Sequence, residues 1–351
     1  MYKQIFRPLA FRIDGETIHH SMIWWASRLL RCPATRALLR STYGRRKKEV
    51  ERDLMGLHFH GMVGFAAGFD KGGELADRLE AMGYSFMEVG TVTPLPQPGN
   101  PKKRIFRLIK DEALINRMGF NSEGLDVVTA RLKRCKKRHI PIAGNLGKNT
   151  ATPNEAAVAD YTLGLQQLYP YVDFFVVNVS CPNVKDLRAL QREDTLAPIV
   201  EALVEARQKQ STYKPILLKL GADPTEEELT YTVKAALEKG IDGFVVSNTT
   251  THRDGLQTTD EQLAAIGAGG LSGRPLHARA LSAVRCVREA AGKGVPIVGV
   301  GGIFSGQDAL AMLQAGASLV EVYTGVIYEG PALARKINKY LKQHEEEIPQ
   351  W

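Results

Sequence analysis

The polar side chains that could do chemistry in this sequence gather where short apolar segments end. Phe174–Asn183 is the most informative segment, because an apolar run ends there in an asparagine, a serine and a thiol, followed by a proline and a second asparagine. The thiol, Cys181, is the one group in this run that could titrate near neutral pH. A lone cysteine is often only a small buried apolar residue, so its role depends on what the other segments place beside it.

Eight such segment ends consist almost entirely of polar residues and glycines. One end of this kind is explained by helix capping, since Asn, Ser, Thr and Gly favour that position. Eight together, with several asparagines and lysines, predict a functional surface. The ends are Ala66–Lys71, Gly90–Pro94, Asn145–Lys148, Asn178–Asn183, Lys219, Ser247–Thr250, Gly299–Gly302 and Tyr323–Gly325.

The elements that carry these ends alternate from residue 60 onward between apolar segments and stretches of helical periodicity. This alternation predicts a parallel sheet, and eight units predict an α/β fold of the (β/α)8 TIM barrel type, with its site at the carboxyl ends of the strands. An open doubly wound sheet is the alternative, but the Gly-x-Gly-x-x-Gly turn typical of it does not follow the first strand. The expected strands are Met62–Phe69, Phe86–Thr93, Pro141–Gly147, Phe174–Ser180, Pro215–Gly221, Gly243–Thr249, Pro296–Gly302 and Leu319–Gly325. The expected helices include Glu74–Met82, Glu123–Lys137, Thr225–Lys239 and Ala278–Ala291.

The N-terminal residues 1–52 differ in composition from residues 53–351, which we expect to form the barrel. They hold 12 lysines and arginines against four acidic residues, which accounts for the whole formal net charge of +8, and two of the three tryptophans. We expect one helix to begin at the cap Asp14 and a second to run from Pro33 to Gly44. The first would align an apolar stripe of Ile18, Met22, Trp25 and Leu29.

An apolar stripe with tryptophan beside arginines is typical of a helix in a membrane interface, and the run is too short and too charged to span a bilayer. Two other interpretations stay open: an amphipathic helical pair packed on its own domain, and a basic arm on nucleic acid. The four cysteines, Cys32, Cys135, Cys181 and Cys286, are far apart. Their spacing predicts neither a zinc site nor a disulfide framework, and it fits a reducing cytosol.

The predicted mouth of the barrel favours binding of a flat ring over hydrolysis. It lacks a metal-ligand cluster, a Ser-His-Asp set and paired carboxylates. Its side-chain amides offer alternating donors and acceptors, which suit a pyrimidine or a flavin. Glycines at Gly301, Gly302 and Gly325 predict a phosphate cradle, and Gly269–Pro275 predicts a loop that approaches a ligand closely.

These motifs resemble the dihydroorotate dehydrogenase family, in its quinone-dependent, membrane-associated class (class 2), from about residue 2 to about residue 340. The matching motifs are Phe65–Gly72, Glu88–Pro94, Ile115–Asn121, Gly144–Asn149, Asn178–Asn183, Ser247–Thr250, Gly269–Leu276, Gly299–Ile303 and Tyr323–Thr324. The resemblance implies oxidation of (S)-dihydroorotate to orotate in pyrimidine (UMP) biosynthesis, with FMN as cofactor and a membrane quinone as acceptor.

Carried over residue by residue, the resemblance implies three sets of contacts. FMN would be bound by Ala66, Ala67, Gly68, Thr91, Asn145, Asn178, Lys219, Ser247, Gly273, Gly302, Tyr323 and Thr324. The substrate would be bound by Lys71, Asn116, Arg117, Met118, Gly119, Phe120, Asn178, Asn183, Asn248 and Thr249. The quinone would pass His19 and Arg107 beneath the N-terminal helices.

The catalytic position departs from the pattern of the quinone class. That class usually has a serine where this chain has Cys181 and a hydroxyl residue where it has Val184, and the pair here looks like the soluble classes. The resemblance implies that Cys181, as thiolate, takes a proton from dihydroorotate while Lys219 stabilises the reduced flavin. A thiol, with an ordinary pKa of about 8.5, can act as this base without a neighbouring hydroxyl.

Three alternatives remain beside the quinone enzyme: a soluble oxidase using fumarate or NAD, a flavin barrel acting on RNA, and a non-enzymatic membrane-surface protein. For the quinone enzyme we expect no nucleic-acid partner, a monomer or homodimer, and peripheral membrane association through residues 1–52. We expect no Arg- and Ser-rich presequence ahead of Met1-Tyr-Lys-Gln. We therefore expect the cytoplasmic face of a bacterial cell membrane.

Overall fold

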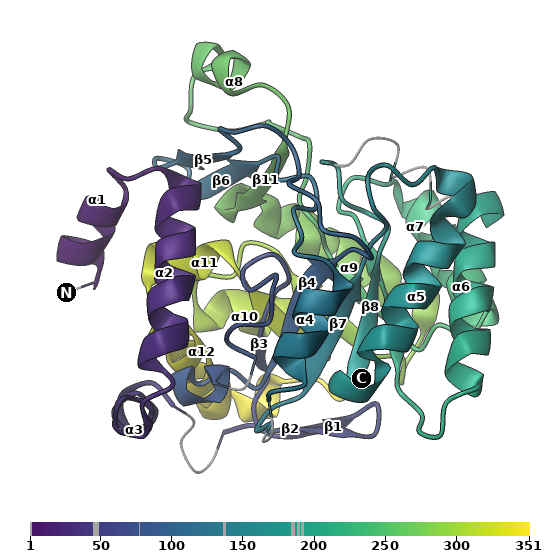
Figure 1. Ribbon diagram of the computed structural model, residues 1–351. Helices are drawn as coiled ribbons and strands as arrows, with labels where there is room; N and C mark the ends of the chain where they lie inside the picture. Colours follow the sequence, from purple (N-terminus) through teal and green to yellow (C-terminus); the bar gives the residue numbers. More distant parts are fainter. Residues whose placement is uncertain are drawn as a thin grey trace.

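The computed structural model describes residues 2–44, 49–76, 78–135, 138–183, 187, 190 and 193–351. Within them, eight parallel strands form a closed barrel in which each strand pairs with the next barrel strand along the chain and the last, β13, pairs with β3. Every expected strand is present, so the predicted TIM barrel is confirmed (Figure 1). The strands are β3 Val63–Phe65, β4 Phe86–Val92, β7 Ile142–Leu146, β8 Phe174–Asn178, β9 Ile216–Leu220, β10 Gly243–Val246, β12 Ile297–Val300 and β13 Leu319–Val322.

Helices cover the outside of the barrel because the strands are mostly apolar and are buried on both faces. In α7, for example, Thr225 and Glu228 form a capping box and the helix buries Leu229, Val233 and Ala236. The covering helices are α4 Leu125–Leu132, α5 Ala157–Leu168, α6 Glu193–Gln208, α7 Glu226–Glu238, α9 His277–Ala291, α10 Gly306–Gln314 and α12 Leu333–Gln343.

One expected helix is wrong. The stretch Glu74–Met82 forms only the short 3-10 helix Leu79–Met82. The buried carboxylate of Asp70 accepts hydrogen bonds from the backbone N–H groups of Glu74 and Leu75, which holds the start of this stretch in a loop. The apolar residues of the stretch therefore pack under a loop and not on a helical face.

The N-terminal segment forms α1 (Arg7–Ala10), α2 (Gly15–Leu29) and α3 (Pro33–Thr42) along one side of the barrel (Figure 1). Asp14 caps α2, accepting hydrogen bonds from two backbone N–H groups, and Pro33 opens α3, as predicted from the sequence. Among the described residues, no helix is long and apolar enough to cross a membrane.

A three-stranded antiparallel sheet lies over the barrel mouth, and sequence patterns did not reveal it. It consists of β5 Ile105–Leu108, β6 Ala113–Asn116 and β11 Gly270–Gly273. The expected loop Gly269–Pro275 is thus partly wrong, because its centre is a strand that pairs with β6. Two short helices, α8 Asp260–Ile266 and α11 Thr324–Glu329, lie near this sheet (Figure 1). A hairpin, β1 Arg52–Leu54 and β2 Leu57–Phe59, lies at the opposite end of the molecule.

Candidate active site

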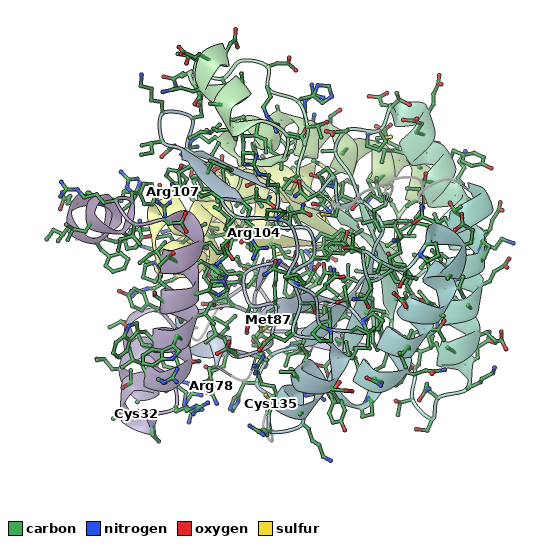
Figure 2. The ribbon with its side chains drawn as sticks, turned by 45° about the horizontal axis from the view of Figure 1, so that its top comes forward. Cys32, Arg78, Met87, Arg104, Arg107 and Cys135 are labelled. Atoms are coloured by element: carbon green, nitrogen blue, oxygen red, sulfur yellow. The ribbon has the colours of Figure 1, made fainter. Side chains whose placement is uncertain are left out.

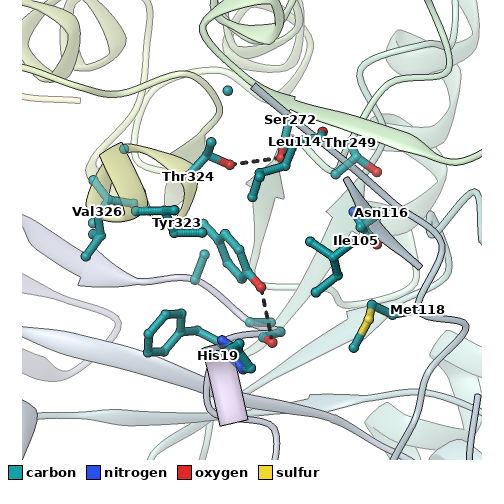
Figure 3. Close-up of a pocket in the computed structure, with 18 of the residues that line it drawn as sticks. His19, Ile105, Leu114, Asn116, Met118, Thr249, Ser272, Tyr323, Thr324 and Val326 are labelled. Carbon is teal, nitrogen blue, oxygen red and sulfur yellow. Dashed lines mark hydrogen bonds between the residues drawn. The ribbon is translucent and has the colours of Figure 1, made fainter. Parts of the chain in front are cut away.

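One continuous cavity runs from the barrel mouth to the N-terminal helices, and most predicted site residues line it. Figure 3 shows His19 and Tyr323 on one side of this cavity and Asn116 and Thr249 on the other. The lining residues predicted for the flavin are Ala66, Ala67, Gly68, Thr91, Asn178, Lys219, Ser247, Gly273, Gly302, Tyr323 and Thr324. The other predicted residues in the lining are Cys181, Lys71, Asn116, Met118, Gly119, Phe120, Asn183, Asn248, Thr249, His19 and Arg107.

Two predicted contact residues do not line the cavity. Asn145 is fully buried behind its wall, where its amide binds Thr91 and Glu88. Arg117 turns its guanidinium away and donates to the backbone carbonyls of Ile266 and Ala268. Both residues therefore act on the site by holding its walls.

Paired amides order one side of the cavity. The Asn183 side chain donates to Asn116 Oδ1 over 2.9 Å and accepts from the backbone N–H of Gly270 over 3.1 Å. Asn248 donates to the hydroxyl of Ser180 over 3.0 Å. Because each amide is oriented by a fixed partner, its remaining donor or acceptor is presented to a ligand in a defined direction.

Cys181 lies three residues beyond β8 and is half-buried at the cavity wall. Lys71 is half-buried and donates to Asn121 Oδ1; desolvation lowers the pKa of Lys71 to about 8, while the nearby Cys181 acts to raise it. An anionic ligand would stabilise the charged form of a lysine that is desolvated in this way. Val184, the predicted companion of Cys181, lies outside the described residues.

A buried polar chain runs below the mouth and connects three predicted residues. Asn178 donates to Thr91 over 3.0 Å, Thr91 donates to Asn145 over 2.6 Å, and Asn145 donates to Glu88 over 2.8 Å. Lys219 Nζ donates to the same Glu88 oxygen over 3.0 Å. Glu88 therefore fixes both the lysine and the amide chain, a role that we did not assign to it from the sequence.

Glu321 is a second buried carboxyl group that sequence reasoning missed. It lines the cavity, and neither of its oxygens has a hydrogen-bond partner among the described residues. Burial and the neighbouring Glu88 raise the pKa of Glu321 well above its ordinary value. For Lys219, burial alone would lower the pKa, but Glu88 and Glu321 outweigh it and the pKa is raised. Glu88 and Glu321 each interrupt an otherwise apolar strand, which is the signal that could have found them.

The glycines at the end of β12 form a cradle that a larger residue would fill. Gly302 has φ +63°, and a Cβ added there would lie 2.5 Å from the Cβ of His277 and 2.9 Å from the carbonyl oxygen of Gly273. Gly301, Gly302 and the first turn of α11 all border the cavity. Backbone N–H groups at such a place fit a phosphate.

The cavity becomes apolar toward the N-terminal helices. His19 packs edge-on against Phe69 with ring centroids 4.8 Å apart, and burial lowers the pKa of His19 to about 4, so its imidazole is neutral at pH 7. Arg107 donates to the carbonyls of Phe11 and Ile13 over 3.1 and 2.8 Å, which ties β5 to this segment. Figure 2 shows Arg107 and Arg104 beside these helices.

Comparison with known proteins agrees with this geometry. The chain matches the family model described as dihydroorotate dehydrogenase over residues 49–344. A relative from Christiangramia forsetii, named dihydroorotate dehydrogenase (quinone), is 45% identical over 339 residues, which cover 97% of this chain and 98% of the relative. A relative of the same name from Streptomyces coelicolor is 40% identical over 352 residues, covering 99% and 96%.

The fold comparison gives the same result. The structure of DHODH from Eimeria tenella in complex with ferulenol is 37% identical, with a TM-score of 0.85, and covers 95% of this chain and 93% of that chain. The match therefore extends over most of the chain. The residue pattern, the barrel and the sequence identity all lead to one conclusion: the chain belongs to the dihydroorotate dehydrogenase family.

Proposed function

We propose that this protein oxidises dihydroorotate to orotate, using FMN as its cofactor and a membrane quinone as the electron acceptor. The observation that carries the proposal is the single cavity, which is lined by oriented amides at the barrel mouth and by apolar residues at the N-terminal helices. A polar ring substrate and an apolar acceptor can therefore reach the two ends of one site. The relatives named dihydroorotate dehydrogenase (quinone), at 40 to 45% identity, support the same reaction.

At the polar end, the chain's own groups bind the substrate and move one proton. Lys71 neutralises the substrate carboxylate, and the Asn116 and Asn183 amides hold the ring in one plane. Cys181 Sγ, as thiolate, takes the proton from the ring carbon beside a carbonyl. Two electrons and the second proton leave from the adjacent carbon, which completes the new double bond.

The residues below the mouth fit a flavin mononucleotide. The cradle of Gly301 and Gly302 would hold its phosphate, and Lys219, fixed by Glu88, would face the ring where negative charge develops on reduction. When bound, FMN would accept the two electrons and pass them on to the quinone. Thr91 and Asn178, tied together over 3.0 Å, would position the ring against the substrate.

The N-terminal segment is proposed to bring the quinone from a membrane surface. Nine of the fifteen large apolar side chains that are exposed in the described residues fall between Ile5 and Leu38. Trp25 is 57% exposed on α2, and Arg28 lies over the ring of Trp24, the arrangement of an interfacial helix. Peripheral binding to the cytoplasmic face of a bacterial membrane follows as part of this proposal.

Acceptor selectivity tests the function. The flavin of the purified protein is first reduced with dihydroorotate without oxygen, and a soluble quinone, fumarate or NAD is then added. We expect the quinone alone to restore the flavin colour rapidly. Rapid reoxidation by fumarate or NAD would favour the soluble class, and no reduction by dihydroorotate would refute the proposed reaction.

Membrane binding needs its own test with a matched pair of variants. We expect Trp25→Glu to reduce co-flotation with anionic lipid vesicles, because a charge on the apolar stripe cannot enter the interface. Leu163→Glu, on the outer face of α5 and 40% exposed, is the control and is expected to float like the wild type. Equal flotation of both variants would contradict the proposed role of α2.

A further inference from the structure

The β1–β2 hairpin gathers four ligand-type side chains on one face. Its register pairs Asp53 with His58 and Arg52 with Phe59. Side chains alternate along each strand, so Glu51 and Asp53 share a face with His58 and His60, while Phe59 points to the other side and is fully buried. The arrangement is thus a consequence of strand periodicity and of the burial of the residue between the two histidines.

The ligand atoms of three of these residues already have the spacing of a metal site. Those of Glu51, His58 and His60 all lie within 4.8 Å of one another. Glu51 Oε2 is 3.7 Å from His58 Nε2, and Glu51 Oε1 is 3.7 Å from His60 Nδ1. Two ligands at about 2.1 Å from a tetrahedral zinc ion are about 3.4 Å apart, so small rotations of exposed side chains close the site.

Asp53 orients one of the imidazoles for this role. Its Oδ1 lies 2.7 Å from His58 Nδ1. An ionised carboxylate only accepts hydrogen bonds, so Nδ1 carries the hydrogen and the lone pair is on Nε2, the nitrogen that faces Glu51. A carboxylate that fixes a histidine through its second nitrogen is the usual support of a metal ligand.

We propose that this hairpin binds a divalent transition metal of the zinc class through His58, His60 and Glu51, with Asp53 as the support of His58. Imidazole ligands select zinc, nickel or copper over magnesium and calcium, which prefer oxygen. Phe59 packs edge-on against Phe86, the first residue of β4, with ring centroids 5.4 Å apart. The metal would therefore link two strands at the amino end of the barrel, opposite the mouth (Figure 1).

Cobalt binding to the full-length, flavin-loaded and tag-free protein tests the site. We expect one Co²⁺ per chain with the visible absorption of a low-symmetry imidazole site, displaced by one equivalent of Zn²⁺. His58→Asn and His60→Asn are each expected to weaken binding at least tenfold, and Asp53→Asn by about 10-fold to 100-fold, the range of a lost supporting contact. Zn²⁺ should also raise the melting temperature of the wild type, but not that of the variants in which a proposed metal ligand is replaced.

The matched control is His344→Asn. His344 also faces a carboxylate, with Nδ1 2.7 Å from Glu347. Among the described residues, however, no third His, Cys, Asp or Glu lies close enough to this pair to complete a metal site. We expect this variant to bind cobalt like the wild type. Absence of stoichiometric binding in the wild type, or equal affinity in the His58 and His344 variants, would overturn the proposal. Dihydroorotate oxidation should be unchanged in all of these variants, so failure here is distinct from failure of the proposed function.

Discussion

Removal of the Glu16 charge should loosen the N-terminal helices from the barrel. Arg104 donates to both Glu16 oxygens over 2.9 and 2.6 Å, and the two side chains are 6% and 4% exposed. Loss of one partner from a buried ion pair costs about 3–5 kcal/mol. Glu16→Gln keeps one acceptor oxygen, and Arg104 keeps its bonds to the Pro98 and Asn100 carbonyls. We therefore expect a loss of about 3 kcal/mol, at the low end of that range.

The effect should also depend on pH. Hydrogen bonds from Arg104 are the main cause that lowers the pKa of Glu16 below its ordinary value. A carboxylate with a lowered folded-state pKa stabilises the fold fully above its unfolded pKa of about 4.3, and the stabilisation disappears as the pH falls through the folded-state pKa. The stabilities of the wild type and Glu16→Gln should thus differ at pH 7 and converge on acidification.

The assay is urea unfolding of both proteins with hydrogen exchange of α2 as the local readout. Because α2 also carries His19, the KM for quinone should rise more than the rate of flavin reduction falls. Glu205→Gln is the control, since Glu205 forms an exposed pair with Lys209 one helical turn away and its loss should leave the transition unchanged. A Glu16→Gln protein whose α2 exchanges like the wild type would refute the reasoning.

Two further predictions concern the barrel and the hairpin. Burial and Glu88 raise the pKa of Glu321, so at a pH above the ordinary pKa of a glutamate the carboxyl group has to take up a proton when the protein folds. Glu321→Gln removes this cost and should stabilise the protein by an amount that grows with pH, by up to about 1.4 kcal/mol per pH unit. Equal urea midpoints of both proteins at pH 5 and pH 8 would contradict this. Met55 and Gly56 form the two-residue turn of the β1–β2 hairpin with φ of 58° and 71°, a type I′ geometry that favours Asn-Gly. Asparagine relieves a left-handed cost of about 1–2 kcal/mol, and the lost packing of the partly buried Met55 against the core offsets part of this gain. Met55→Asn should therefore stabilise by about 0.5–1 kcal/mol; a lower melting temperature would argue against it.

The barrel could be predicted from sequence because its strands are mostly apolar and alternate with helical stretches. The polar residues at the strand ends also supported it, because most of them line one site. Part of the site followed from the same ends, so Cys181, Lys71 and Asn183 could be expected at one mouth, whereas residues such as Asn116 and His19 were assigned only through the resemblance to the family. The sheet over the mouth could not, because β6 and β11 are four-residue strands about 150 residues apart in sequence. Nothing local indicates such a pairing.

Glu88 and Glu321 illustrate a second limit. Each is a single acidic residue in a mostly apolar strand. The role of each depends on Lys219, which comes close to both carboxyl groups only in the closed barrel. The same holds for Arg117, whose motif predicted substrate contact while its guanidinium holds the 266–268 backbone. Motifs locate the backbone of a site, but side-chain direction follows from partners that are distant in sequence.

The most direct test of the central claim is the rate at which dihydroorotate bleaches the flavin in an anaerobic rapid-mixing experiment. Cys181→Ala should retain the flavin and slow this step by about 10² to 10⁴, the loss expected when a general base is removed. Cys181→Ser should recover little, because a hydroxyl is a poorer base than a thiol and Val184 supplies no helping hydroxyl. Wild-type-like reduction of Cys181→Ala by dihydroorotate would contradict the account.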